Sequence, residues 1–511
     1  MNLSELLARN ARKYPLKEAI IENNVSFTYA EVDEVVNRIA SALAKLGISQ
    51  GDKVILYIPN TKEFVFSYFA VVRLGAIVVP VNVRLATEEV RYIIQHCEAK
   101  MVIAHEATYK ELEPLAGKLN VIWVKTGDVV DQWLTLSTLI AEGDTEKIEC
   151  PLRGEDEVSI LYTSGTTGRP KGVVFTNRNI LTVANMMALE TKMDKQSRVL
   201  HMMPLSHSAP LHLFLFGGFY VGATHILSPL FTPELLLTFV EKYHITHFFG
   251  APVAYLLTAK HPSLSQYDLS SVQYWVYGGA PLSRNEVKII KEQFKTNRLM
   301  CVYGLTEAGP NGTYLSPEEH ETKAGSIGRD AALHCEIKIV DDNGDEVASG
   351  EVGEVILAGD GTMKEYYKDE EKTKQTIRDG WLYTGDLAMR DEDGYIWIID
   401  RRKDVIISGG VNIYPKEIED ILKTHPSITD VAVIGVPHHE WGETVKAFVI
   451  LAQPIGNLEE ECKQFLAGKL ADYKIPRLYE TVENIPRNAT GKILKHVLKE
   501  GGGVDERVIR S

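Results

Sequence analysis

The sequence has only five cysteines in 511 residues, and no two of them form a Cys-x-x-Cys pair. Such scattered cysteines disfavour a zinc site or a disulfide framework and favour a reducing, cytoplasmic setting. The chain also lacks a basic excess, because 55 lysines and arginines stand against 69 aspartates and glutamates, for a net charge of −14. Nonspecific binding of nucleic acid needs a basic surface, so we expect no nucleic-acid partner.

Long apolar runs are missing as well. The first residues, MNLSELLARNARKYP, contain no apolar core of signal-peptide length and predict an amphipathic helix. No charged residue occurs between Arg198 and Glu234, but prolines, glycines and histidines interrupt this stretch, which disfavours a membrane span. We interpret it as buried core and as the wall of an apolar pocket, and peripheral contact with a membrane stays open.

What the sequence does contain is an alternation of apolar, β-branched runs with helical patterns. Strands are predicted at residues 53–59, 76–81, 101–105 and 120–124, and a helix at residues 62–74. Strands that are apolar along their length and alternate with helices indicate a parallel sheet covered on both faces. The predicted fold class is therefore α/β, and ligands are expected at the carboxyl ends of the strands.

The pattern changes from about Cys335. The segments EIKIVDDNGDEV, GEVILAG and GYIWIID predict short strands joined by tight turns, as in a small antiparallel barrel or sheet. A charged run at residues 401–404 precedes a compact α+β pattern with helices expected from Pro415 and near residues 458–470. We predict a large domain at residues 1–400, a hinge at 401–404, a mobile domain at 405–498 and a tail at 499–511.

The segment YTSGTTGRPKG, residues 162–172, combines glycines, hydroxyl side chains and a lysine, a composition typical of a loop around phosphate. It is not a Walker A loop, because Lys171 is followed by Gly172 rather than by Ser or Thr, and because strands are predicted on both sides. We interpret it as a flap that closes over phosphates. An ordinary hairpin turn is the alternative.

Four further segments place polar residues after strands or at turns: VYGLTEAG (302–309), YTGD (383–386), DRRKDVIISGGVNIYP (400–415) and PRNATGKILK (486–495). Taken singly, each has a structural explanation as a turn residue, a solvated acid, a charged linker or a surface lysine. Together, in this order, they resemble the adenylate-forming ligases, which include acyl-CoA synthetases, firefly luciferase and the adenylation domains of peptide synthetases. The resemblance covers nearly the whole chain.

The resemblance implies a large N-terminal domain of two α/β subdomains plus a small β-barrel, followed by a small mobile α+β domain. It also implies ATP, Mg²⁺ and coenzyme A as cofactor and co-substrates. A carboxylate is a poor acyl donor because its leaving group would be oxide. These enzymes therefore attack the α-phosphorus of ATP to give acyl-AMP and pyrophosphate, and a thiol then displaces AMP, while positioned cations and N–H donors stabilise the charge on the phosphates.

The resemblance also assigns residues. The loop over the β- and γ-phosphates comprises Thr163, Ser164, Gly165, Thr166, Thr167, Gly168 and Lys171. The catalytic positions are Glu307 as the Mg²⁺ ligand, Thr306 at the α-phosphate, Lys492 at the forming adenylate and His207 beside the acyl carboxylate. The other nucleotide and coenzyme A positions are Gly279, Ala280, Pro281, Tyr303, Gly304, Asp386, Arg401, Gly409 and Gly410. For His207, a buried core histidine is the alternative.

Within these roles Tyr303 stacks on adenine, Asp386 accepts the ribose hydroxyls, Lys403 matches the hinge, and the Gly409–Gly410 turn passes beside pantetheine. Adenylation domains of peptide synthetases hold the amino group of their substrate with an aspartate, but the matching stretch MPLSHSAPL (203–211) has no acid. We therefore expect a CoA ligase, with luciferase-type oxidation as a rarer alternative.

The expected acid is a fatty acid of medium or long chain, and an aryl acid such as a cinnamate is the second choice. The expectation rests on an uncharged wall formed by residues 200–233, Phe248, Phe249, Ala251, Tyr277 and Gly304. A noncatalytic nucleotide-binding protein is the alternative from another class, and the presence of both Glu307 and Lys492 disfavours it. A homodimer is compatible with the sequence.

Overall fold

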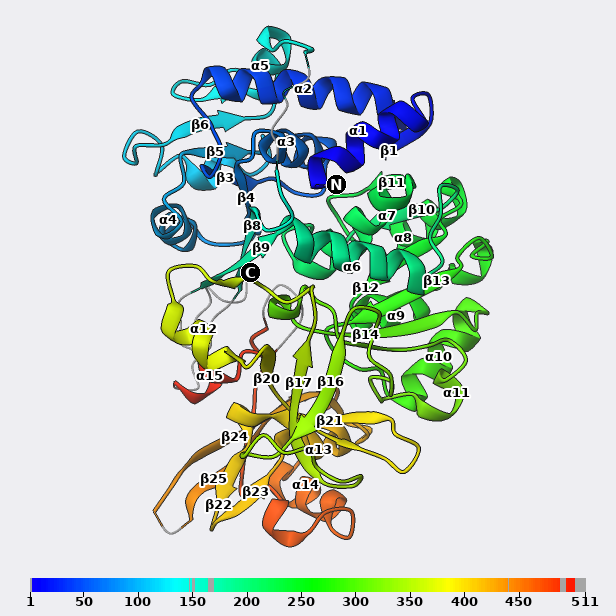
Figure 1. Ribbon diagram of the computed structural model, residues 1–511. Helices are drawn as coiled ribbons and strands as arrows, with labels where there is room; N and C mark the ends of the chain where they lie inside the picture. Colours follow the sequence, from blue (N-terminus) through cyan, green and yellow to red (C-terminus); the bar gives the residue numbers. More distant parts are fainter. Residues whose placement is uncertain are drawn as a thin grey trace. The chain divides into compact units, whose positions relative to one another are not determined.

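The structure is a computed structural model that describes residues 2–146, 148, 152–163, 170–439, 441–487 and 493–500. The chain forms two compact units (Figure 1). The first comprises residues 1–337 and 357–382, and the second residues 338–356 and 383–511. The chain passes from one unit to the other within strands β16 (Glu336–Val340), β17 (Val352–Ala358) and β20 (Trp381–Arg390).

The first unit contains an eight-stranded sheet in the order β15-β14-β13-β12-β10-β11-β1-β2. Its inner pairs are parallel, and only the outer pairs β1–β2 and β14–β15 are antiparallel. The strands are β1 (Glu18–Glu22), β2 (Val25–Thr28), β10 (Arg198–His201), β11 (Thr224–Leu227), β12 (His247–Gly250), β13 (Tyr274–Gly278), β14 (Leu299–Tyr303) and β15 (Thr313–Leu315).

A second eight-stranded sheet of this unit follows the order β18-β9-β8-β4-β3-β5-β6-β7. It is parallel from β8 to β7, whereas β9 lies antiparallel to both β8 and β18. The strands are β3 (Lys53–Tyr57), β4 (Ile77–Pro80), β5 (Met101–Ala104), β6 (Ile122–Lys125), β7 (Leu134–Thr135), β8 (Glu157–Thr163), β9 (Lys171–Thr176) and β18 (Glu365–Tyr366). The four strands predicted before residue 125 are all present.

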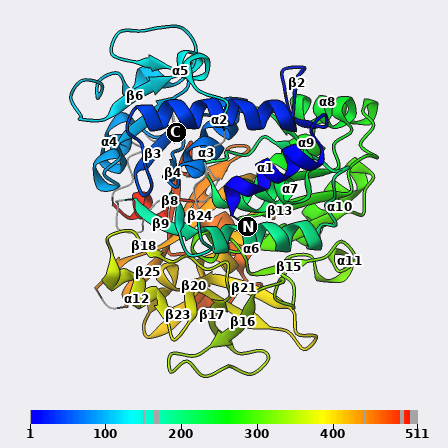
Figure 2. The same cartoon turned by 45° about the horizontal axis from the view of Figure 1, so that its top comes forward.

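Helices cover both faces of the first sheet. Alternate residues of a strand point to opposite faces, and here apolar residues are buried on both faces. On β13 and β14, Val276 and Met300 belong to a buried cluster with Met187 of α6, whereas Trp275 packs edge-on against Phe294 of α10. Helices α8, α9 and α10 lie together on that second side (Figures 1 and 2). The helices that cover the two faces of this sheet are α6 (Asn177–Glu190), α7 (Phe216–Val221), α8 (Pro233–Tyr243), α9 (Pro252–Ala259) and α10 (Arg284–Phe294).

Helix α3 (Lys62–Arg73) packs on β3 and β4 of the second sheet and is buried from Phe64 to Arg73. Its Phe69 ring contacts Phe216 and Phe219 at centroid distances of 5.9 and 4.8 Å, so it also packs on α7. The remaining helices of the first unit are α1 (Leu3–Lys13), α2 (Tyr29–Lys45), α4 (Thr87–His96), α5 (Leu136–Glu142), α11 (His320–Lys323) and α12 (Glu370–Thr376). Capping boxes at Asn2 and Thr28 begin α1 and α2.

The uncharged stretch between Arg198 and Glu234, expected to be core, is largely buried. Two of its histidines hydrogen-bond to neutral groups. His201 Nε2 lies 2.9 Å from His225 Nδ1, and His212 Nδ1 lies 2.9 Å from the Gly309 carbonyl oxygen. Burial lowers the pKa of His201 to about 3 and the pKa of His212 to about 4. These imidazoles are therefore neutral at physiological pH.

A five-stranded sheet joins β16, β17, β20, β19 (Ile377–Arg378) and β21 (Ile396–Arg401), which agrees with the short strands expected after Cys335. The C-terminal part has its own sheet in the order β23-β22-β25-β24, with β26 beside β25. Its elements are β22 (Ile406–Ser408), β23 (Val411–Ile413), α13 (Pro415–Leu422), β24 (Ile428–His438), β25 (Gly442–Leu451), α14 (Leu458–Leu466), β26 (Leu478–Thr481) and α15 (Lys495–Lys499). Helix α14 ends earlier than predicted, before Gly468 at φ +74°.

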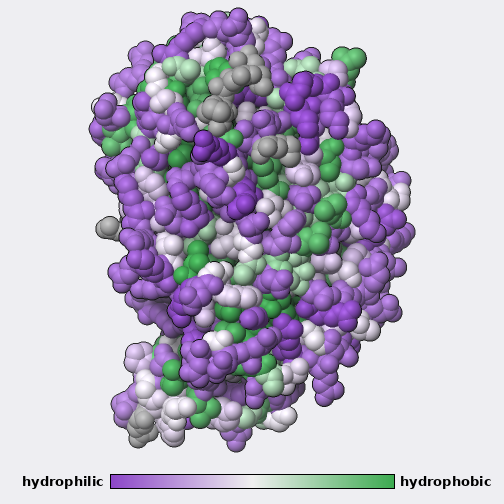
Figure 3. All heavy atoms as spheres, viewed as in Figure 1, coloured by the Kyte–Doolittle hydropathy of each residue, from purple (hydrophilic) through white to green (hydrophobic). Residues whose placement is uncertain are grey.

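One face of the protein is mainly hydrophilic. The face in Figure 3 is mostly purple, with apolar side chains scattered in small groups. Among the residues that the structure describes, no helix has both the length and the apolar character to cross a membrane.

Candidate functional site

The glycine-rich segment leaves one strand and enters another, as predicted. Strands β8 and β9 pair antiparallel, with Tyr162 opposite Gly172 and Thr163 opposite Lys171. Thr163 and Lys171 therefore lie side by side at the loop end of a hairpin. Ser164, Gly165, Thr166, Thr167 and Gly168 lie outside the described residues, so their predicted contacts with phosphates stay predictions.

An aromatic cluster that sequence reasoning missed packs against this hairpin at Tyr162, next to the loop. The Tyr162 hydroxyl lies 2.7 Å from His96 Nδ1, and the His96 ring stacks on Tyr92 at 5.3 Å and meets Tyr367 edge-on at 5.7 Å. Gly172 is closely packed here, because a Cβ on it would lie 2.8 Å from Ile160 Cγ2. These contacts fix the end of strand β8 and the start of strand β9.

The second predicted motif begins where β14 ends. The 3₁₀ turn Thr306–Ala308 carries Glu307, whose Oε1 accepts a hydrogen bond of 2.8 Å from the Tyr366 hydroxyl. The ammonium of Lys171 lies 5.5 Å from the centre of the Tyr366 ring. Burial, and then the charge of Lys372, lowers the pKa of Lys171. The structure therefore brings the loop lysine and the predicted metal ligand to one tyrosine.

The carboxylate of Glu307 suits a shared magnesium ion. Among the described residues, no hydrogen bond reaches its Oε2, and no group of three or more histidine, cysteine or acidic side chains could enclose a metal. Mg²⁺ is commonly held by one or two carboxylates together with substrate phosphates and water. One oriented carboxylate, with an oxygen that no described residue binds and with a lysine for phosphate nearby, fits that mode.

Thr306 and His207 lie on neighbouring loops of the first sheet. The Thr306 hydroxyl is 3.3 Å from that of Ser208, and the Asn82 amide nitrogen is 3.3 Å from His207 Nε2. Because the amide nitrogen donates, Nε2 accepts and Nδ1 carries the proton. Burial, and then the charge of Arg84, lowers the pKa of His207 to about 4, so the ring is a neutral hydrogen-bond donor.

The predicted adenine positions follow adjacent strands. Gly278 at the end of β13 pairs with Val302 of β14, so Tyr303 and the Gly279–Pro281 turn leave the same edge of the sheet. Gly279 has φ +82°, with open space where a side chain would stand. Gly304 has a steric role instead, because a Cβ would lie 2.3 Å from the Pro310 carbonyl oxygen.

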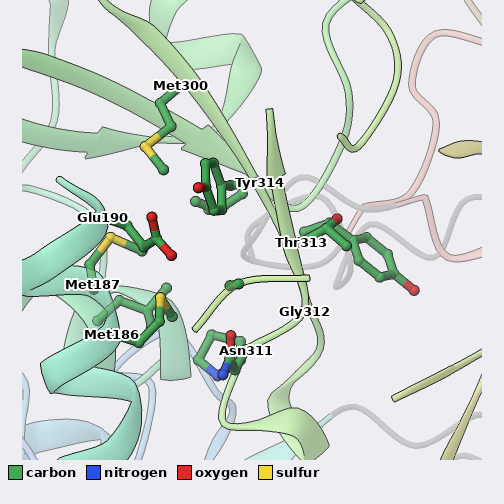
Figure 4. Close-up of a pocket in the computed structure, with 13 residues that line it drawn as sticks. Met186, Met187, Glu190, Met300, Asn311, Gly312, Thr313 and Tyr314 are labelled. Atoms are coloured by element: carbon green, nitrogen blue, oxygen red, sulfur yellow. The ribbon is translucent and has the colours of Figure 1, made fainter. Parts of the chain in front are cut away.

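A small cavity lies beside these strand ends. Its volume of about 10 Å³ is the room that one water molecule needs. The labelled side chains of Met186, Met187, Met300 and Glu190 surround it together with Asn311, whose Oδ1 is buried without a partner among the described residues (Figure 4). Phe248 and Tyr277 of the predicted acyl wall are fully buried core residues, and the acyl tunnel stays a prediction.

In the second unit, Asp386 and Arg401 are opposite each other on β20 and β21. Arg401 Nε lies 2.5 Å from Asp386 Oδ1, and Asp386 is only 5% exposed. The carboxylate predicted to hold ribose is thus fixed by a guanidinium. Lys403 is exposed on a 3₁₀ turn at Arg402–Asp404, and desolvation of its ammonium lowers its pKa.

The Gly409–Gly410 turn joins β22 to β23 and has φ values of +58° and +81°. The Gly409 N–H donates to the Trp441 carbonyl oxygen at 2.8 Å, and a Cβ on Gly409 would lie 2.8 Å from Trp441 Cε3. The Trp441 ring is 41% exposed and has the Arg477 guanidinium 5.1 Å from its centre. Sequence reasoning missed both residues, although a tryptophan in a polar, glycine-rich region was an available signal. Lys492 lies outside the described residues.

Comparison with known proteins identifies the family of the chain. The model of the family described as AMP-binding enzyme matches residues 7–367, and the AMP-binding enzyme C-terminal domain matches residues 417–492. A long-chain-fatty-acid–CoA ligase, FadD13 of Mycobacterium tuberculosis (strain ATCC 25618 / H37Rv), is 35% identical over 98% of both chains. A feruloyl-CoA synthase of Amycolatopsis sp is 34% identical over 95% of this chain and 96% of its own.

Among solved structures, the anthranilate CoA ligase AuaEII in complex with anthranoyl-AMP superposes with a TM-score of 0.89. It is 30% identical, over 98% of this chain and 96% of that chain. A Mycobacterium tuberculosis fatty acyl CoA synthetase superposes with a TM-score of 0.78 at 32% identity, over 98% of both chains. The expected mixed α/β fold, with a large N-terminal and a smaller C-terminal domain, is confirmed.

Proposed function

The chain belongs to the AMP-binding enzyme family, and from that membership we propose that its substrate is a fatty acid of medium or long chain. It is an ATP-dependent, AMP-forming acyl-CoA ligase, which activates a carboxylic acid with ATP and transfers the acyl group to coenzyme A. Both the resemblance read from the sequence and the expected enzyme class are thereby confirmed.

The observation that carries the choice of acid is that the sequence segment around His207 carries no charged side chain. No charged residue occurs between Arg198 and Glu234, and burial keeps His207 neutral. The ammonium group of an amino acid would find no counter-charge in the 203–211 segment. The relation to a long-chain-fatty-acid–CoA ligase supports the same choice.

A second candidate is a compact aryl acid. The similarity to a feruloyl-CoA synthase and to an anthranilate CoA ligase supports this alternative.

The proposed roles follow the assigned residues. A carboxylate oxygen of the acid attacks the α-phosphorus of ATP, the bond to the pyrophosphate oxygen breaks, and pyrophosphate leaves. Lys171 and Thr163 hold the outer phosphates, Thr306 the α-phosphate, and Lys492 the developing negative charge. His207 donates through Nδ1 to the acid and keeps it oriented.

In the second step the sulfur of coenzyme A attacks the acyl carbonyl, and AMP leaves with the electron pair of the broken bond. Gly409 and Gly410 leave room for the thiol arm, and Asp386 holds the ribose. Mg²⁺, when bound through Glu307, would neutralise phosphate charge. Alternation of the C-terminal domain about Lys403, a cytoplasmic location and a homodimer belong to the same proposal.

A panel of acids tests the substrate. Acetate, octanoate, palmitate, cinnamate, ferulate and several amino acids are compared by AMP formation that depends on coenzyme A. We expect the aliphatic acids to show the highest kcat/KM, rising along the series because each buried methylene contributes about 0.8 kcal/mol. A maximum for ferulate or cinnamate would select the aryl candidate, and a maximum for acetate or an amino acid would reject both.

A further inference from the structure

Tyr366 lies at the centre of the phosphate-binding region, yet no motif of the sequence points to it. It stands on the short strand β18, which pairs with β9 through Tyr366 and Val173. Strand β9 begins at Lys171, so β18 is fixed beside the strand that carries the loop lysine. Tyr366 is only 6% exposed, so its side chain is packed inside this region.

Two contacts give this side chain a double role. Its hydroxyl donates 2.8 Å to Glu307 Oε1, and its ring lies 5.5 Å from the ammonium of Lys171. The backbone adds a further tie, because the Met363 N–H donates 2.7 Å to the Glu307 carbonyl oxygen. A phenol between a carboxylate and an ammonium separates the two charges and keeps them from pairing with each other.

Helix α12 holds the backbone of Tyr366 in place. The Tyr366 N–H donates 2.9 Å to the Thr373 hydroxyl of α12, and that hydroxyl in turn donates 2.8 Å to the Asp369 carbonyl oxygen. The hydrogen bond runs from the phenol to the carboxylate, so the Tyr366 hydroxyl acts as the donor. The hydroxyl is thereby directed at one carboxylate oxygen only.

We infer that Tyr366 is a positioning residue that presents Glu307 Oε2 to the magnesium ion of the Mg²⁺–ATP complex and holds Lys171 apart for the phosphates. The inference rests on the proposed role of Glu307. A hydrogen bond at Oε1 fixes the rotation of the carboxylate, so that Oε2 is the oxygen left for a metal. Without it, Glu307 is free to turn toward Lys171, and a salt bridge there would oppose binding of both metal and phosphate.

The test uses Tyr366→Phe, which keeps the ring under Lys171 and removes only the hydroxyl. Its matched control is Tyr367→Phe, since Tyr367 neighbours it in the same segment but contacts His96 rather than Glu307. Binding of α,β-methylene-ATP, which cannot release pyrophosphate, is measured by calorimetry with Mg²⁺ and with EDTA. Thermal melting verifies that each variant is folded.

We expect Tyr366→Phe to bind the analogue about tenfold more weakly in Mg²⁺, the typical effect of one lost hydrogen bond to a charged group, and to match the unchanged protein in EDTA. Tyr367→Phe should match it in both. In a Glu307→Gln background, Tyr366→Phe should add no further loss, because the group it orients no longer serves the metal.

Three results would overturn the inference: binding by Tyr366→Phe equal to that by Tyr367→Phe, an equal loss in EDTA and in Mg²⁺, or full additivity with Glu307→Gln. The unchanged protein separates this failure from that of the proposed function. If it shows no Mg²⁺-dependent binding of the analogue and releases no pyrophosphate from ATP and any acid, the proposed function itself is wrong.

Discussion

Replacing Gly409 by leucine should stop the thioester step while sparing adenylation. Gly409 has φ +58°, a conformation that costs an L-residue roughly 1–2 kcal/mol. The new Cβ would also lie 2.8 Å from Trp441 Cε3, so the indole, which is 41% exposed, has to move toward solvent. This cost is below the 5–15 kcal/mol that typically stabilises a domain, so the variant should remain folded.

The functional loss should be much larger than the loss of stability. A leucine side chain on this turn occupies the space proposed for the thiol arm, and the displaced tryptophan adds to the obstruction. Thioester formation from purified acyl-AMP and coenzyme A should slow about a hundredfold, equivalent to nearly 3 kcal/mol in the barrier. Pyrophosphate release from ATP and acid should stay within about twofold, since no adenylation group is changed.

Gly468→Leu is the matched control. Gly468 belongs to the same C-terminal region and has φ +74°, and apart from its chain neighbours no described residue has a heavy atom within 4 Å of the place that a Cβ would take. It therefore shares the backbone strain of Gly409 without the contact with Trp441. Both half-reactions should be normal in this control. Equal losses in the two half-reactions for Gly409→Leu, or the same selective loss for Gly468→Leu, would refute the reasoning.

Two further predictions follow from the same chemistry and from the buried histidines. Lys492→Ala should slow acyl-AMP formation about a hundredfold in a pyrophosphate assay and leave thioester formation from supplied acyl-AMP unchanged; a loss in the second step alone would contradict the assigned role. The free energy of unfolding should fall as the pH drops from about 6.5 to 4, because buried His212, with its pKa lowered to about 4, stays neutral in the fold while the unfolded imidazole binds a proton. This histidine alone should lower the free energy of unfolding by about 2 kcal/mol at pH 5 relative to neutral pH. In urea melts, the free energy of unfolding of His212→Asn should therefore depend less steeply on pH than that of the unchanged protein.

The sheet architecture was readable from the sequence because its signals are local. Apolar, β-branched runs such as 53–57 and 101–104 become parallel strands, and the hairpin around Thr163 and Lys171 follows from strands on both sides of a glycine-rich segment. The motif residues Tyr303 and Thr306 follow directly from the end of β14 for the same reason. Their functional roles came from the family resemblance rather than from pattern alone.

What the sequence could not provide are contacts between distant segments. Tyr366 and Glu307 are 59 residues apart, and nothing near Tyr366 distinguishes it from Tyr367. The contact of Gly409 with Trp441 depends on how β22 and β25 pair, which periodicity does not determine. Gly304 was interpreted as part of the acyl wall, yet its close approach to Pro310 depends on a loop path that only the folded chain defines.

Oxygen labelling tests most directly whether the carboxylate of the acid attacks the α-phosphorus of ATP. The protein is incubated with ATP, coenzyme A and a fatty acid labelled with ¹⁸O in its carboxyl group, and the nucleotide products are analysed by mass spectrometry. We expect AMP that carries one labelled oxygen and pyrophosphate that carries none, because the carboxylate attacks the α-phosphorus. ADP with labelled inorganic phosphate, or AMP without label, would contradict it.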